Sequence, residues 1–179
     1  MQGAATVMGH PIHPIFVVFP IAFFIGSLVC DIICRYRRDD FWRRAALLLI
    51  GFGLIGGLIA AVFGFIDYFT LPLDGEERED ATIHMIANLV VMGLFTANFF
   101  LRRRNPDARL GYALSVIGVL GLIYAGFIGG EMVYQDHLGV APHEGRQLLL
   151  GSTIADFTGC FAFLAALMSR YRTVSQRAL

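Results

Sequence analysis

The stretch AALLLIGFGLIGGLIAAVFGFIDYFT, residues 45–70, decides the fold, because it contains only one charged side chain, Asp67. A helix rises about 1.5 Å per residue, so about 20 apolar residues cross the roughly 30 Å hydrocarbon core of a bilayer. Inside lipid every backbone polar group must be paired, and the stretch shows no alternating strand pattern. It therefore predicts a membrane-spanning helix.

Four further apolar runs have the same character. The predicted spans are at about residues 14–34, 45–70, 83–101, 110–134 and 148–168. Hydrophobic residues make up 56% of the chain and charged residues 16%, a composition that suits lipid. We therefore predict an all-α, up-and-down bundle of five helices that forms one transmembrane domain over residues 1–179. Its solvent partner is the lipid bilayer, and nothing in the sequence indicates a nucleic-acid partner.

The orientation follows from the arginines, which supply all 14 basic residues. Only Arg78 and Arg146 lie in the second and fourth connections. The others occupy the first connection, the third connection and the C-terminal tail: Arg35, Arg37, Arg38, Arg43, Arg44, Arg102, Arg103, Arg104, Arg109, Arg170, Arg172 and Arg177. Short connections rich in arginine stay in the cytoplasm. The N-terminus is therefore predicted outside and the C-terminus inside.

Small residues recur on two of the spans and allow close helix crossings in lipid. The predicted crossing positions are Gly53, Gly57, Ala61 and Gly64 on the second span, and Gly118, Gly121, Gly126 and Gly130 around the fourth. Helix packing accounts for these residues without any ligand.

The predicted topology places all five histidines, His10, His13, His84, His137 and His143, on the outer side of the membrane. Asp67 ends the second span and Glu131 lies near the outer end of the fourth, where a carboxylate is costly unless it is paired or functional. Imidazole and carboxylate groups are ligands of iron, copper and zinc. The sequence therefore predicts a metal centre that faces outward, with ligands among His10, His13, His84, His137, Asp67 and Glu131. Of these, His13, His84 and His137 are expected to converge.

Local geometry adds to this hypothesis. A residue before proline avoids the α conformation, so His10 and His13 are predicted to be extended, with Pro14 opening the first helix and His13 capping it. Asn88 lies one helical turn after His84 and could orient that ligand. Each histidine could instead be an ordinary interfacial residue, and the two carboxylates could cap helices or pair with Arg78 and Arg146. Asp156, inside the fifth span, is a separate intramembrane acid.

Several motifs resemble the bacterial predicted membrane proteins of the domain-of-unknown-function 2231 family, over roughly residues 8–141. They are, in order, Gly9–Pro14, Phe19–Ile21, Gly64–Asp67, His84 with Asn88, and Gly129–Tyr134 followed by His137 and Gly139–Val140. The resemblance implies a four-helix membrane unit that in other proteins is sometimes joined to Rieske-type iron–sulfur domains. It thus hints at redox work in a bacterial inner membrane. The span at 148–168 is additional to this plan.

The leading hypothesis is a multi-pass inner-membrane protein with a periplasm-facing iron, copper or zinc centre for electron transfer or redox chemistry, served by a periplasmic or membrane redox partner. Tyr134 would be a redox or hydrogen-bonding neighbour of this centre. Whether the protein is an enzyme, and its oligomeric state, stay open. One alternative is a carrier of haem b, with two axial histidines and Arg146 or Arg78 at the propionates. Another is a non-redox transporter or assembly subunit, which would need no metal.

Overall fold

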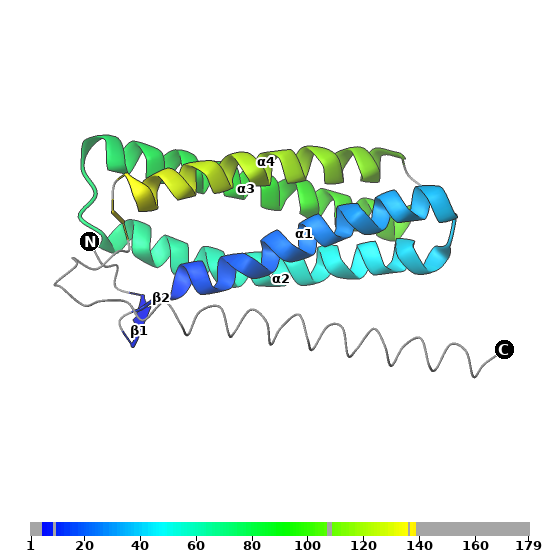
Figure 1. The fold of residues 1–179 in the computed structure, drawn as a ribbon, viewed down its shortest axis with the longest axis horizontal. Coiled ribbons are helices and arrows are strands. Elements are labelled where there is room, and N and C mark those ends of the chain that lie inside the picture. Colours follow the sequence, from blue (N-terminus) through cyan, green and yellow to red (C-terminus); the bar gives the residue numbers. More distant parts are fainter. Residues whose placement is uncertain (1–4, 9, 107–108, 136, 139–179) are drawn as a thin grey trace, which may run out of the picture. The chain divides into compact units, whose positions relative to one another are not determined.

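The computed structural model describes residues 5–8, 10–106, 109–135 and 137–138 (Figure 1). Four long helices dominate these residues: α1 (Ile12–Arg37), α2 (Asp40–Thr70), α3 (Gly75–Arg104) and α4 (Arg109–Tyr134). Each is long and apolar enough to cross a membrane, which confirms four of the predicted spans. The fifth predicted span, 148–168, lies outside the described residues. Two short antiparallel strands, β1 (Thr6–Val7) and β2 (His10–Pro11), precede α1.

The helix ends explain two differences from the sequence predictions. α1 begins at Ile12 after an extended Pro11, so the prediction that His13 is an extended cap residue is wrong. Pro14 is tolerated in this first turn because backbone N–H groups there have no intrahelical partner. α3 begins at Gly75, well before the predicted span, and carries Glu76 and Glu77 in its first turn. Negative charge at a helix N-terminus is stabilising, so the acidic connection becomes helix.

Short connections make sequential helices antiparallel neighbours. The α1–α2 connection is closed by Arg38, whose left-handed backbone donates its N–H to Cys34 O, and by Asp39, whose carboxylate accepts from the backbone N–H of Phe41 at 2.9 Å. Figure 1 shows the resulting α1–α2 and α3–α4 hairpins packed into one bundle. α2 contacts α3 and α1 contacts α4, which places α1 and α3 diagonally across it. The hydrophobic core between the four helices consists of Phe24, Ile50, Val91, Phe95, Val119 and Leu122.

The second hairpin repeats the first. α2 carries the pattern G-x-x-G-x-x-x-A-x-x-x-G at Gly53, Gly56, Ala60 and Gly64, and α4 carries the same pattern at Gly118, Gly121, Ala125 and Gly129. α1 opens with IHPI at residues 12–15, and α3 carries IHMI at residues 83–86. Equivalent glycines also have equivalent neighbours, because Gly53 lies against the Phe24 ring and Gly118 against the Phe95 ring. The bundle is therefore two copies of one helical hairpin, related by an approximate two-fold axis.

Equivalent residues of α1 and α3 meet at this axis, as expected for a two-fold interface. At mid-height the rings of Phe24 and Phe95, both 0% exposed, stack with centroids 3.8 Å apart and planes 1° apart. His13 meets His84 at one end of the axis. Asp31 meets Arg102 at the other. We call these the histidine end and the arginine end.

The repeat also corrects the predicted crossing faces. Gly53, Gly64, Gly118 and Gly121 lie close to side chains of α1 or α3, as predicted. A Cβ at Gly126 or Gly130 would meet no described atom within 4 Å, so these two residues do not lie where the described helices cross. On α4 the crossing face runs one position earlier, through Ala125 and Gly129. These two residues are the equivalents of Ala60 and Gly64 on α2.

Candidate functional site

Two of the predicted ligands, His13 and His84, lie face to edge at the histidine end. Their ring centroids are 6.5 Å apart and their planes are at 86°. His13 comes from the first turn of α1, and His84 from the third turn of α3, at the equivalent position of the repeat. Both side chains are half-buried. The two-fold arrangement thus brings together histidines that are far apart in the sequence.

Each ring is held through Nδ1 by a backbone carbonyl of the neighbouring helix. His13 Nδ1 lies 2.8 Å from Ala60 O on α2, and His84 Nδ1 lies 2.9 Å from Ala125 O on α4. A carbonyl oxygen can only accept, so Nδ1 is the protonated nitrogen in both rings. The lone pair of each neutral imidazole is then on Nε2. This is the tautomer used by a histidine that binds a metal through Nε2.

Glycines make room for both rings. A Cβ on Gly64 would lie 2.9 Å from His13 Cε1, and a Cβ on Gly129 would lie 2.8 Å from His84 Cε1. Only glycine therefore lets the rings reach the carbonyls one turn earlier on α2 and α4. In each repeat, the last glycine of the shared pattern therefore leaves space for the histidine ring of the same repeat.

Asn88 breaks the symmetry of the pair. Its Nδ2 donates to His84 O at 2.9 Å and lies 3.1 Å from His84 Nε2, which accepts in this tautomer. Among the described residues, nothing is hydrogen-bonded to His13 Nε2. The equivalent of Asn88 in the first repeat is Val17, which has no polar group. One of the two Nε2 lone pairs is thus occupied and the other is not.

The remaining predicted ligands have other partners. His10 is exposed and its Nδ1 lies 3.1 Å from Met8 O, and His137 is exposed with Nδ1 2.9 Å from Gln135 O. The Asp67 carboxylate accepts from the backbone N–H of Ala5 at 3.3 Å. Glu131 accepts from Gln135 Nε2 at 3.5 Å. In the described part of the chain, no group of three or more His, Cys, Asp or Glu residues is placed to hold a metal ion.

The predicted neighbours of the centre are placed less favourably. Tyr134 ends α4 with 83% of its surface exposed. Arg78 donates from Nε to Leu73 O at 3.2 Å, and its guanidinium lies 5.4 Å from the centroid of the Tyr68 ring. Arg146, together with His143 and Asp156, lies outside the described residues.

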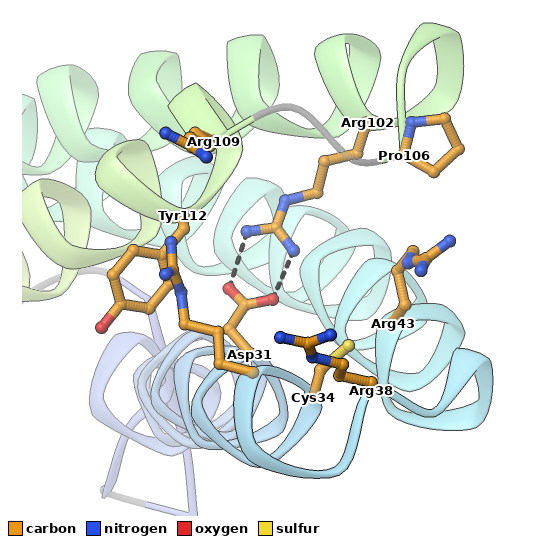
Figure 2. A pocket seen from close by; sticks show the side chains of 9 residues that line it. Asp31, Cys34, Arg38, Arg43, Arg102, Pro106, Arg109 and Tyr112 are labelled. Carbon is orange, nitrogen blue, oxygen red and sulfur yellow. Dashed lines mark hydrogen bonds and ion pairs between the residues drawn. The ribbon is translucent and has the colours of Figure 1, made fainter.

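A buried ion pair that the sequence patterns did not predict lies at the arginine end. Arg102 and Asp31, which are 6% and 7% exposed, form two hydrogen bonds of 2.5 and 2.6 Å (Figure 2). Arg102 also donates to Asn98 Oδ1, Gly111 O and Ser115 Oγ. The available signal was Asp31 itself, an acid inside the first apolar run. Arg102 was counted only as one of the arginines that set the orientation.

Four apolar helices arranged as two repeated hairpins define a multi-pass membrane protein with a paired-histidine site. The chain belongs to the family described as "Predicted membrane protein (DUF2231)", whose model matches residues 9–142. The match covers both hairpins and confirms the resemblance seen in the sequence. No curated protein and no solved structure matches the chain.

Proposed function

We propose that the chain is an electron-transfer protein of a bacterial inner membrane that binds a redox-active transition metal between His13 and His84. The observation that carries the proposal is the pair of Nδ1 contacts to Ala60 O and Ala125 O. They engage Nδ1 of both rings and leave Nε2 as the ligand atom, which in His84 accepts a hydrogen bond from Asn88. Histidines that bind metals commonly have such a partner on the other nitrogen. The predicted orientation puts this pair at the periplasmic end of the bundle.

The distance between the rings favours ligands on opposite sides of one metal ion. Two imidazoles that bind one ion from opposite sides, at about 2 Å each, hold their ring centroids roughly 6 Å apart. The centroids of His13 and His84 are 6.5 Å apart. Two ligands of a tetrahedral site would bring the centroids closer together. The spacing is therefore compatible with His13 and His84 holding one metal ion between them.

Haem b is the form of centre that these two ligands suit best, because the macrocycle supplies the other donors. A zinc or copper site usually needs three or four protein ligands, and no third one is grouped with this pair among the described residues. If His13 and His84 both held such a group, it would supply one-electron redox chemistry and not a position for a substrate. This arrangement suits transfer of single electrons between partners.

Asn88 is the residue that would adjust on metal binding. Its Nδ2 carries two hydrogens and reaches both His84 O and His84 Nε2. When Nε2 binds a metal, the contact to His84 O alone can keep the amide in place. Asn88 thus gives His84 Nε2 a hydrogen-bond donor when no metal is bound. Replacing that one hydrogen bond by a metal would cost little free energy, because the contact to His84 O remains.

Absorption spectroscopy and elemental analysis of the full chain, purified in mild detergent, test this proposal. A Soret band that shifts on reduction would support haem b, and a stoichiometric metal without that band would support a centre without a macrocycle. His13→Ala and His84→Ala should each remove most of the bound group, because one of its two protein ligands is lost. His10→Ala and His137→Ala are matched controls at the same end and should retain it.

Two results would contradict the proposal. The first is a wild-type protein without haem or metal when produced in cells supplied with both. The second is retention of the bound group in both the His13 and the His84 variants. Either result would favour a non-redox transporter or assembly subunit, in which the histidine pair only ties the two hairpins together.

A further inference from the structure

A pocket of about 380 Å³ opens at the arginine end of the bundle, opposite the histidine pair (Figure 2). Five of its nine lining residues are arginines: Arg35, Arg38, Arg43, Arg102 and Arg109. They come from α1, α2, α3 and α4, so the bundle itself assembles the pocket. Its volume is in the range of small-molecule sites.

The charges of the described residues that line this pocket do not cancel. Among them Asp31 is the single acid, and its carboxylate is fully engaged by Arg102. Arg43 pairs with Asp40 at 3.0 Å. Among the described residues, Arg35, Arg38 and Arg109 lie beside no carboxylate within ion-pair distance. Three positive charges around one concave surface favour binding of an anion, and guanidinium groups bind phosphate well because they can form two parallel hydrogen bonds to it.

Two of these arginines are held in place. The Arg35 guanidinium lies 4.1 Å from the centroid of the Tyr112 ring, a stacking arrangement that joins α1 to α4. Arg38 has a left-handed backbone with φ 52°, at a helix C-terminus where glycine is the preferred residue. The backbone alone therefore does not explain an arginine at this position. The Tyr112 contact thus orients the Arg35 side chain, and the turn fixes the backbone of Arg38 at the pocket.

The depth of the pocket points to lipid. It lies where α1 and α3 end and α4 begins. The last turn of α1 also carries the exposed aromatic side chain of Tyr36, and this is the level at which apolar helix surface gives way to charge. Phospholipid headgroups occupy this level, and aromatic side chains are enriched there. Basic pockets between helix ends bind anionic headgroups. We propose that this pocket binds the phosphate of an anionic phospholipid through Arg35, Arg38 and Arg109.

Lipid titration of the full chain in detergent tests this proposal. Phosphatidylglycerol should raise the unfolding temperature of the wild type and should be retained in native mass spectra, whereas uncharged phosphatidylcholine should do neither. Arg35→Gln combined with Arg109→Gln should weaken phosphatidylglycerol binding about tenfold or more, because two charge-assisted contacts are lost. Arg37→Gln combined with Arg104→Gln removes the same charge from exposed last-turn arginines outside the pocket and should leave binding unchanged.

Three results would overturn the proposal. One is equal stabilisation by the two lipids. Another is equal weakening by the two double variants, which would mean that diffuse charge attracts the lipid. The third is stabilisation by inorganic phosphate alone as large as that by phosphatidylglycerol, with no lipid retained, which would assign the pocket to a free phosphate compound. If the pocket variant does not fold, the comparison of phosphatidylglycerol with phosphatidylcholine on the wild-type protein still tests the proposal.

Discussion

At the scale of single residues, the most costly feature is the ion pair between Asp31 and Arg102. A charge buried without its partner is strongly unfavourable, whereas a well-packed apolar replacement of both partners is often nearly neutral. Arg102→Ala should therefore lower the free energy of unfolding by about 3–5 kcal/mol. The double variant Asp31→Leu/Arg102→Met should recover most of that loss. Unfolding measured by denaturant titration in detergent checks both values.

The hydrogen bonds of Asn98 and Ser115 decide how the single and double variants are compared. Asn98 Nδ2 donates to Ser115 Oγ at 2.9 Å, a bond that does not involve Arg102, whereas Asn98 Oδ1 and Gly111 O lose an Arg102 donor in both variants. The difference between the single and the double variant then reports chiefly the unpaired Asp31 carboxylate. Equal destabilisation in the single and double variants would show that Arg102 stabilises the bundle through packing and not through charge.

Residue identity alone predicted part of the site. The sequence predicted that His13, His84 and His137 converge, because each lies near the same end of the bundle. His13 and His84 do meet, whereas His137 is exposed and its Nδ1 lies near Gln135 O. The sequence did not indicate the Ala60 and Ala125 carbonyls that orient the rings, since a backbone carbonyl has the same chemistry at every residue. It also missed Asp31, because which face of a long apolar helix turns inward depends on packing with its neighbours.

At the scale of helices, the glycines under the histidines determine whether the site can form. Gly64→Ala and Gly129→Ala should each reduce binding of the proposed metal centre, because the new methyl groups would lie 2.9 and 2.8 Å from the Cε1 atoms of His13 and His84. Overpacking of this kind should also cost about 1–3 kcal/mol of stability. Metal content and unfolding of the purified variants are the measurements.

Gly126→Ala is the matched control on α4, because its methyl group would meet no described atom within 4 Å. Alanine favours helix over glycine by about 1 kcal/mol, so this variant should be as stable as the wild type or more stable. If Gly64→Ala and Gly129→Ala behaved like this control in stability and metal content, the rings would not depend on the glycines.

Helix positions were predictable because hydropathy is a local property of the chain, and the four confirmed spans needed no knowledge of their neighbours. Helix ends were less predictable, because the charges of Glu76 and Glu77 are typical of a loop until their position at a helix N-terminus is known. The crossing face was displaced by one residue in part of α4. Glycines occur on several faces of these helices, and only packing selects among them.

At the scale of the whole molecule, the two-fold repeat explains why the axis holds both like and unlike pairs. His13 with His84 and Phe24 with Phe95 are identical pairs, as in a symmetric dimer of hairpins. Asp31 with Arg102 is complementary, and two separate copies of one hairpin would have placed like charges together there. Joining the repeats in one chain lets equivalent positions differ. The repeat thus keeps a symmetric site at one end and a charged network at the other.

The orientation of the molecule gives the last prediction. Arg102, Arg103 and Arg104 end α3, and the strongly acidic segment lies at the other end of that helix. Positive residues resist export, so alkaline phosphatase fused after residue 75 should be active and phosphatase fused after residue 105 inactive. Because the repeats run in the same direction, a fusion after residue 39 should be inactive as well, which checks the result independently. The reverse pattern would put the histidine pair in the cytoplasm and the arginine pocket outside.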